Sequence, residues 1–236
     1  GLVVPALLAG NTVIIKPPRF GVLFFDFLLE PLASCFPPGT VHVLSGDGPA
    51  VLDPLLKSGG LDVFAFIGSK AVADRLTSLH PKRTRLRVLL GLGAKNAAVI
   101  LPDADLETAV GECLLGALAF NGQRCAALKI LFVHEAVRKP FLDRLAAETA
   151  KIRIGMPWAK GVRITPLADP VRMSYLRSLI DDAAGRGADV INENGGRSAG
   201  SLLCPAVLQP VTPRMRIYRE EQFGPLVPIV DFRRME

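Results

Sequence analysis

The sequence is poor in the side chains on which several protein classes depend. Its 236 residues include one tryptophan and two tyrosines, too few for a base-stacking surface that binds nucleic acid. No stretch approaches the roughly 20 apolar residues that cross a bilayer, so no membrane is an expected partner. The four cysteines form no CxxC pair and have no histidine at metal-ligand spacing, which argues against a disulfide scaffold and a metal site. They are Cys35, Cys113, Cys125 and Cys204.

Positive charge exceeds negative charge without being concentrated. The net charge is +6 and half of the residues are hydrophobic, which is an ordinary globular composition. The densest basic stretch, residues 82–87, is short and contains no aromatic residue, so an anionic small molecule is a better expectation than nucleic acid. The cysteine usage suits a reducing, cytoplasmic compartment. Residues 1–5 have neither an initiator methionine nor a signal peptide, so we expect a fragment that lacks both termini.

Short β-branched runs alternate with longer helical stretches along the chain. This order predicts an α/β fold with a parallel sheet. The stretch over 22–35 is apolar on most sides and is predicted to be a buried helix. Ser69 is predicted to cap the helix over 70–79. Further strands are expected over 12–15, 40–44, 63–67, 88–90, 97–101, 130–133 and 189–191, and further helices over 50–57, 106–120, 137–152 and 175–186.

One cysteine differs from the others in its neighbours. The run Phe120-Asn121-Gly122-Gln123-Arg124-Cys125 follows a predicted buried helix, so Gly122 should end that helix and leave Cys125 on a turn. Arg124 places positive charge beside the thiol, which favours a reactive thiolate. The residues alone leave a second interpretation open, because a lone cysteine is more often a small buried hydrophobic residue.

Five segments together resemble the aldehyde dehydrogenase superfamily. They occur in the family's order and spacing over essentially the whole chain, which makes the set far more specific than any one of its members. The matches are Ala9–Pro17 to the adenosine-binding strand, Phe66–Ser69 to the phosphate-proximal turn, Gly93–Asn96 with Leu101–Leu106 to a further block, Gly122–Cys125 to the active-site motif, and Glu220–Pro225 to the second motif.

The resemblance implies a fold and a reaction. Residues 1–92 would form a partial Rossmann-like dinucleotide-binding domain, and residues 93–236 a partial α/β catalytic thiol domain. The Cys125 thiolate would attack an aldehyde to give a thiohemiacetal, held by the Cys125 N–H and by an asparagine upstream of this chain. Hydride transfer to a nicotinamide would then leave a thioester. Full-length family members associate into dimers and tetramers, a property left undecided for this chain.

The resemblance also assigns cofactor contacts to residues in both halves of the chain. Lys16 would bind the adenosine ribose, and Gly68 and Ser69 would face the pyrophosphate at a helix N-terminus. Glu221 would bind the nicotinamide ribose, and Phe223 would lie behind the nicotinamide ring. Each also has a structural interpretation: Lys16 as a solvated strand end, Ser69 as a helix cap and Phe223 as a core residue.

Two arginines bear on specificity. Arg19 stands near the position where NAD-preferring relatives often carry a glutamate, and a guanidinium there attracts a 2′-phosphate, so NADP is favoured over NAD. Arg124 resembles the arginine that helps to bind the substrate phosphate in non-phosphorylating, NADP-dependent glyceraldehyde-3-phosphate dehydrogenases, the members that the chain resembles most. The alternative for Arg124 is a simple ion pair with a neighbouring residue.

One departure from the family pattern concerns release of the product. Hydrolytic members carry a glutamate where this sequence has Gly91. Without that general base, water attack on the thioester should slow by about 10²–10⁴-fold, whereas a thiol such as coenzyme A needs less help. Three hypotheses follow: oxidation of a small anionic aldehyde such as glyceraldehyde 3-phosphate, a coenzyme A-acylating semialdehyde dehydrogenase, and a truncated relative that only binds nucleotide or self-associates.

Overall fold

The computed structural model describes residues 2–234, which divide into two compact units, Gly1–Leu92 and Gly93–Glu236. Both units combine helices with parallel strand pairing, so the predicted α/β fold class is confirmed. Between residues 2 and 234, no helix combines the length and the hydropathy that a membrane crossing requires.

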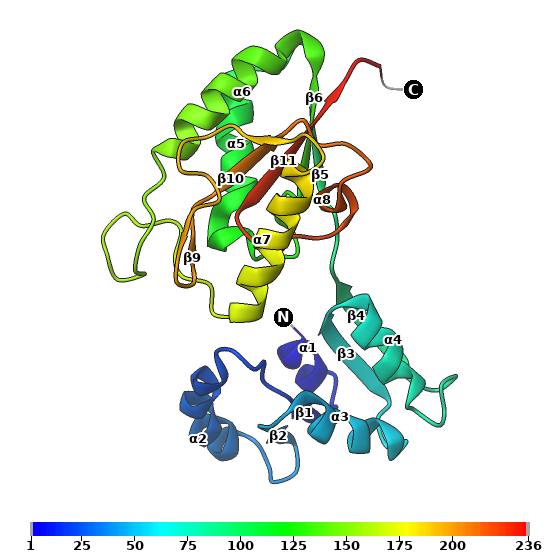
Figure 1. Ribbon diagram of the computed structural model, residues 1–236. Helices are drawn as coiled ribbons and strands as arrows, with labels where there is room; N and C mark the ends of the chain where they lie inside the picture. Colours follow the sequence, from blue (N-terminus) through cyan, green and yellow to red (C-terminus); the bar gives the residue numbers. More distant parts are fainter. Residues whose placement is uncertain (1, 235–236) are drawn as a thin grey trace. The chain divides into compact units, whose positions relative to one another are not determined.

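Unit 1 contains two pairs of parallel strands (Figure 1). β1 (Val13–Ile15) pairs with β2 (Val41–Val43), and β3 (Val63–Gly68) pairs with β4 (Arg87–Leu92). Helices separate these strands along the chain, as the alternating pattern predicts. They are α1 (Val3–Leu8), the 3₁₀ helix η1 (Val22–Phe25), α2 (Asp26–Cys35), α3 (Gly48–Lys57) and α4 (Lys70–Ser78).

The core of unit 1 is small and joins α3 and α4 to β3. Leu56, Phe64, Leu76 and Leu86 form its buried cluster. The Ser69 hydroxyl accepts a hydrogen bond from the amide of Val72 at 3.4 Å, so the predicted N-cap of α4 is confirmed. Ser69 therefore directly follows the carboxyl end of β3.

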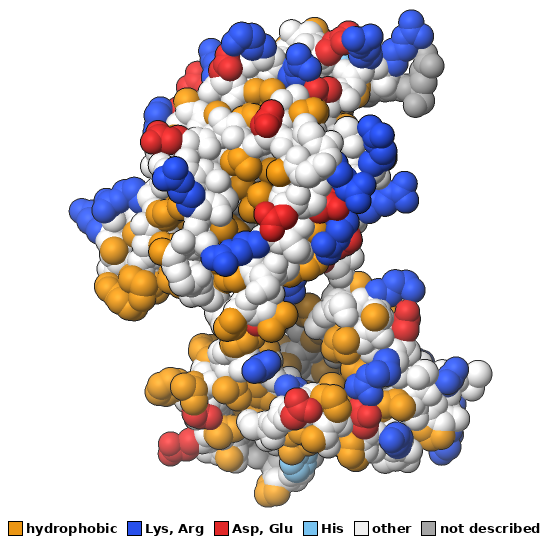
Figure 2. All heavy atoms as spheres, viewed as in Figure 1, with side chains coloured by type: hydrophobic (Ala, Val, Ile, Leu, Met, Phe, Trp, Pro, Cys, Tyr) orange, Lys and Arg blue, Asp and Glu red, His pale blue; other side chains and the backbone are white. Residues whose placement is uncertain are grey.

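The expectation of a buried helix over 22–35 is wrong. Residues 22–25 form a 3₁₀ turn, and none of the residues of α2 is buried. Phe27 is 82% exposed, and Leu23 and Phe24 are also exposed. Figure 2 shows hydrophobic side chains at the surface of this part of the molecule. Among the described residues no element covers this apolar side, and composition alone cannot reveal whether such a cover exists.

Unit 2 is built on a five-stranded sheet of order β5-β6-β11-β10-β7. The first four of these strands are parallel, and β7 pairs antiparallel with β10. A separate hairpin joins β8 (Ser198–Ala199) to β9 (Leu202–Leu203). The sheet strands are β5 (Ala97–Ile100), β6 (Ile130–His134), β7 (Asp189–Val190), β10 (Ala206–Gln209) and β11 (Leu226–Phe232).

Helices cover both faces of this sheet (Figure 1). Val207 of β10 belongs to the core cluster that contains residues of α5 and α6, whereas its neighbours Ala206 and Leu208 belong to the cluster that contains residues of α7. This alternation follows from the two-residue period of a strand. The helices of unit 2 are α5 (Leu106–Leu118), the 3₁₀ helix η2 (Ala119–Gly122), α6 (Glu135–Ala150), α7 (Pro170–Ala184) and α8 (Arg216–Arg219).

Several helix boundaries differ from the sequence prediction, and two of the differences have a clear physical reason. α7 begins at Pro170, five residues before the predicted start at 175, because the Asp169 side chain accepts from the Val171 amide and Pro170 occupies the first helical position. α5 ends at Leu118, two residues before the predicted end at 120, and a 3₁₀ helix leads from there to Gly122. The helix ends earlier because the chain turns at Phe120 and Asn121.

Candidate active site

The segment that carries Cys125 starts with a strained turn. Phe120, Asn121 and Gly122 have φ values of 54°, 60° and 68°, all in the left-handed region. That conformation costs about 1–3 kcal/mol for a residue other than glycine. Gly122 is required at its position, because a Cβ there would lie 2.5 Å from the Gly224 carbonyl oxygen. The turn brings the chain out of α5 and leaves Cys125 exposed.

Two asparagines hold this turn in place. Asn121 Nδ2 donates to the Thr165 carbonyl and hydroxyl oxygens, both at 3.1 Å, and its Oδ1 accepts from the Thr165 amide at 2.9 Å. Asn96 Nδ2 donates to the carbonyl oxygens of Cys125 at 2.7 Å and Ala127 at 2.9 Å. The backbone around the thiol is therefore fixed from both sides, although the sequence prediction gave neither asparagine a role.

A buried lysine makes the third contact with the turn. Lys129 Nζ donates to the carbonyl oxygens of Gly122 at 3.1 Å and Arg124 at 2.9 Å. Burial lowers the pKa of Lys129, while the carboxylate of Glu221 acts in the opposite direction. The sequence prediction missed this residue, although one signal was present: a single lysine within the apolar run 126–133.

The segment 220–225 packs directly against the turn. Lys95 Nζ donates to Gln222 Oε1 at 2.7 Å and to the Glu220 carbonyl oxygen at 2.9 Å. Gln222 Nε2 in turn donates to the Lys129 carbonyl oxygen at 2.9 Å. Together with the close approach of Gly122 to Gly224, these bonds join two sequence motifs that lie about a hundred residues apart.

Several ionisable groups in or next to the segment 220–225 have shifted pKa values. Burial, followed by the charge of Lys129, lowers the pKa of Lys95 to about 7. Glu220 forms a two-point ion pair with Arg216, which lowers the pKa of the carboxyl. Burial and the neighbouring Glu220 raise the pKa of Tyr175, whose hydroxyl donates to Glu220 Oε2 at 3.1 Å.

Arg124 does not form the ion pair that was its alternative interpretation. Among residues 2–234 its guanidinium pairs with no acid; Nη2 donates to the carbonyl oxygens of Leu115 and Gly116 at 3.4 and 3.3 Å. The guanidinium carbon also lies 5.8 Å from the centre of the Phe120 ring. Its Nε is a buried atom with no hydrogen-bond partner within the described residues.

The two cofactor residues predicted in unit 2 lie beside Lys129. Glu221 Oε1 is 3.5 Å from Lys129 Nζ and is a buried acceptor with no hydrogen-bond partner in the described part of the chain. A Cβ on Gly93 would overlap Glu221 Oε2, so glycine makes room for this carboxylate. Phe223 has a left-handed φ of 43°, and its ring centre lies 4.8 Å from Lys129 Nζ. An unused carboxylate oxygen of this kind suits a sugar hydroxyl.

The four cofactor residues predicted in unit 1 lie at the carboxyl ends of strands or shortly after them. Lys16 directly follows β1, and Gly68 and Ser69 lie where β3 leads into α4. A Cβ on Gly68 would lie 2.5 Å from the Phe66 ring, so packing alone explains a glycine at this position. Arg19 is exposed, with its guanidinium 5.5 Å from the centre of the Phe20 ring. Strand ends and a helix N-terminus are where α/β folds bind dinucleotides.

Gly91 lies inside β4, where it pairs with Ile67 of β3. A Cβ at this position would approach Ile67 Cγ1 to 3.2 Å, and Ile67 is itself exposed. The strand therefore offers no side chain at the position of the family's base, although its neighbour could yield to a larger residue.

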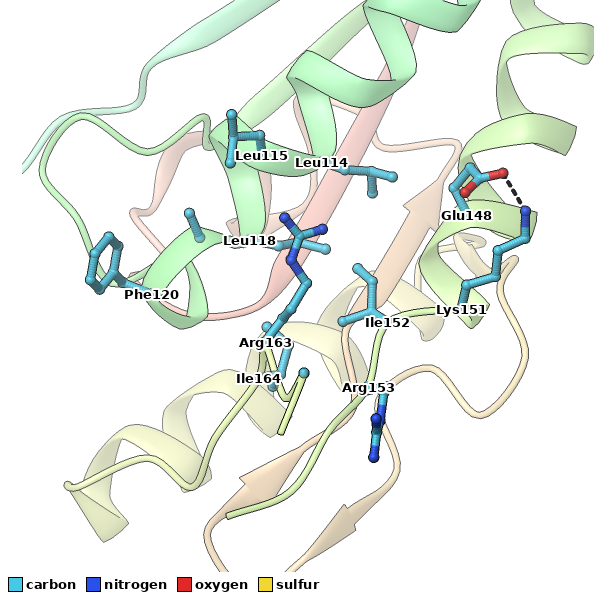
Figure 3. A pocket seen from close by; sticks show the side chains of 12 residues that line it. Leu114, Leu115, Leu118, Phe120, Glu148, Lys151, Ile152, Arg153, Arg163 and Ile164 are labelled. Carbon is cyan, nitrogen blue, oxygen red and sulfur yellow. Dashed lines mark hydrogen bonds and ion pairs between the residues drawn. The ribbon is translucent and has the colours of Figure 1, made fainter. Parts of the chain in front are cut away.

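A cavity of about 450 Å³ opens in unit 2 on the outer side of α5 (Figure 3). Leu114, Leu115 and Leu118 form an apolar wall, and Arg153 and Arg163 come from the loop after α6. Glu148 and Lys151 form an ion pair at its rim. Phe120 also lines the cavity but Cys125 does not, so the cavity is not assigned to the substrate of the thiol.

A profile of the aldehyde dehydrogenase family matches residues 1–236. The NADP-dependent glyceraldehyde-3-phosphate dehydrogenase of Streptococcus equinus is 33% identical over 230 residues, which are 97% of this chain and 47% of that protein. The solved structure of NADP-dependent glyceraldehyde-3-phosphate dehydrogenase from Bacillus halodurans C-125, complexed with NADP, is 34% identical with a TM-score of 0.90, and the match covers 98% of this chain and 47% of that one.

A second solved structure, succinate-semialdehyde dehydrogenase from Burkholderia pseudomallei, has a TM-score of 0.90 at 31% identity, with 98% of this chain and 48% of that one covered. The chain thus spans about half the length of these relatives. Their fold confirms the predicted aldehyde dehydrogenase-like architecture. Since the family profile extends over the whole sequence, the chain belongs to the aldehyde dehydrogenase family, as its motifs implied.

Proposed function

We propose that the protein oxidises an aldehyde with NADP, using Cys125 as the nucleophile. The observation that carries this proposal is the packing of the Cys125 turn against the segment 220–225. It is supported by Lys129, whose Nζ bonds to the Arg124 carbonyl and lies 3.5 Å from Oε1 of Glu221, the predicted nicotinamide-ribose ligand. When bound, the nicotinamide would supply the hydride acceptor.

The residues of this chain would act in a defined order. The Cys125 thiolate adds to the aldehyde carbon to form a thiohemiacetal, whose oxyanion accepts a hydrogen bond from the Cys125 amide. Glu221, whose Oε1 lies 3.5 Å from Lys129 Nζ and has no hydrogen-bond partner in residues 2–234, would hold a ribose hydroxyl. Loss of hydride leaves a thioester on Cys125, and a nucleophile then releases the acyl group.

The preferred coenzyme is NADP, with NAD as the alternative. Arg19 is exposed four residues after the end of β1, and its guanidinium would attract the 2′-phosphate that distinguishes NADP. Lys16 and Ser69 would bind the ribose and the pyrophosphate. The relative from Streptococcus equinus is named NADP-dependent, and the structure from Bacillus halodurans contains NADP.

The preferred substrate is a small anionic aldehyde such as glyceraldehyde 3-phosphate. Arg124 adjoins the nucleophile in sequence, and its guanidinium donates to carbonyl oxygens and not to an acid in the described residues, so its positive charge suits a phosphate. Gly91 favours a second candidate, a coenzyme A-acylating semialdehyde dehydrogenase, because a thiol needs no general base to release the thioester. The four free cysteines suit the cytoplasm as the proposed compartment.

Absorbance of reduced nicotinamide tests the proposal. Mixed with glyceraldehyde 3-phosphate and NADP, the protein should form reduced coenzyme, and Cys125→Ser should form none. A single burst that becomes steady turnover only with coenzyme A would favour the acylating candidate. Nucleotide binding without a burst would overturn the catalytic proposal and leave a relative that only binds nucleotide. Absence of nucleotide binding would also remove the assignments of Lys16 and Glu221.

A further inference from the structure

Lys129 is the largest fully buried side chain in the described part of the protein, with 1% of it exposed. A buried ammonium is unfavourable unless its protons have acceptors. Two of its three protons are used by the carbonyl oxygens of Gly122 and Arg124, at 3.1 and 2.9 Å. Glu221 Oε1 lies 3.5 Å from the same nitrogen.

The contact with the Arg124 carbonyl has a consequence for the next residue. That carbonyl belongs to the same peptide unit as the Cys125 amide, and in a planar trans peptide the N–H points opposite to the C=O. Because Lys129 lies on the carbonyl side, it directs the Cys125 N–H away from itself. A cation on the carbonyl oxygen also polarises the peptide and strengthens the N–H as a donor.

The charged groups around Lys129 are of both signs. Glu221 is the acid that faces Lys129, Glu220 acts on the neighbouring Lys95, and Lys95 and Arg124 are the further basic groups. Burial has the largest effect on the pKa of Lys129 and lowers it; Glu221 and then a thiolate at Cys125 act in the opposite direction. Lys129 Nζ bonds at 2.9 Å to the carbonyl of the residue before Cys125, so its charge lies within one peptide unit of that residue.

Arg124, the cation expected from the sequence to lie beside the thiol, is engaged elsewhere. Its guanidinium donates to carbonyl oxygens at the end of α5 and lies near the Phe120 ring. Lys129 approaches the turn from β6, behind the peptide that leads into Cys125.

We propose that Lys129 is the positioning residue of the nucleophile: it orients the Arg124–Cys125 peptide and provides the buried positive charge that stabilises the Cys125 thiolate. The inference deepens the proposed function, but it concerns the reactivity of the thiol itself. It can therefore be tested without aldehyde or nucleotide.

The test follows alkylation of Cys125 by iodoacetamide as a function of pH, with peptide mass mapping to identify the modified residue. Lys129→Met keeps a long unbranched side chain and removes the charge. Alkylation of Cys125 at pH 7 should become about tenfold slower, with the pH profile displaced upwards by about one unit. The exposed Cys35 of unit 1 is the internal reference, and its rate should not change.

Glu221→Gln provides the opposite perturbation. Removing the acid leaves the positive charge of Lys129 less compensated, so alkylation of Cys125 should become faster and its pH profile should move down. A role limited to packing predicts that both variants loosen the turn and change the rate in the same direction. Opposite signs therefore distinguish an electrostatic role from a structural one.

Lys139→Met is the matched control, because Lys139 is an exposed lysine of α6 that pairs only with Asp143 in the described residues. Its Cys125 profile should equal that of the unchanged protein. An unchanged profile in Lys129→Met, or equal signs in Lys129→Met and Glu221→Gln, would overturn the proposal. If Lys129→Met does not fold, Glu221→Gln decides alone, and an unchanged or slower rate counts against the inference. Missing aldehyde oxidation with both rate changes intact would overturn only the proposed function.

Discussion

Gly122 lies in the turn that precedes Cys125 and is in close contact with backbone atoms of other residues. These contacts determine how the protein responds to a substitution of Gly122. Its φ of 68° favours glycine, and a Cβ would meet the carbonyl oxygens of Gly224 and Ala117 at 2.5 and 2.7 Å. Backbone atoms cannot move aside as a flexible side chain can. Gly122→Ala should therefore lower the free energy of unfolding by about 2–4 kcal/mol, the sum of backbone strain and overlap. Urea denaturation measures this change.

Gly111→Ala is the matched control for that substitution. Gly111 lies in the middle of α5, and a Cβ there has no neighbouring atom within 4 Å. Alanine should stabilise the helix by about 0.5–1 kcal/mol. If both glycine variants changed stability in the same direction, the contact between the turn and Gly224 would not be the cause.

At the scale of elements, the loop between α6 and α7 is held by one side chain of the turn, that of Asn121. Asn121 makes three hydrogen bonds to Thr165, and Trp158, the only tryptophan of the chain, is exposed in the same loop. Asn121→Ala should cost about 1–3 kcal/mol, because the part-buried amide and carbonyl of Thr165 lose their partner. The freed loop should also lower the fluorescence anisotropy of Trp158.

Asn192, a second buried asparagine, is the control that separates the loss of stability from the release of the loop. Asn192 binds the Pro205 carbonyl at 2.9 Å and the Val207 amide at 2.8 Å, at another place in unit 2. Asn192→Ala should lower stability by a similar amount and leave the anisotropy of Trp158 unchanged. Equal anisotropy in the two variants would show that Asn121 does not hold the loop.

Element boundaries show what the sequence could and could not predict. The start of α7 was predictable, since Asp169 and Pro170 are a cap followed by a first-turn proline. The end of α5 was not, because Phe120 and Asn121 follow an apolar helical pattern and nothing local indicates their left-handed backbone. The exposure of α2 depends on whether another element covers it, which a local pattern does not contain.

The residues of the candidate site also divide into those that the sequence could predict and those that it could not. Cys125, Glu221 and Phe223 belong to short motifs, so the sequence could propose them as site residues. The contacts of Lys129 with Glu221 and Phe223 show that these two residues lie near each other. The residues that hold the turn, Asn96 and Lys129, act through backbone carbonyls. Such contacts depend on the folded path of the chain, which residue types and spacing do not specify.

At the scale of the whole molecule, unit 2 carries the thiol, and unit 1 carries Gly91 at the position where hydrolytic family members have their base. Gly91→Glu should supply a general base and raise hydrolytic turnover of the thioester by about 10²–10⁴-fold. The new side chain needs Ile67 to move by a few tenths of an ångström, which its exposure permits. Release of the acid after the first turnover, followed by steady-state formation of reduced coenzyme, measures the gain.

Gly91→Gln is the control for this gain, because glutamine has the shape of glutamate but does not accept a proton from water at neutral pH. If both variants raise turnover equally, the effect comes from filling β4 and not from base catalysis. If neither does while coenzyme A supports turnover in all three proteins, release by a thiol is the natural route. The lack of a carboxylate at position 91 would then not be what prevents hydrolysis, whereas a gain in Gly91→Glu alone would show that a carboxylate there activates water.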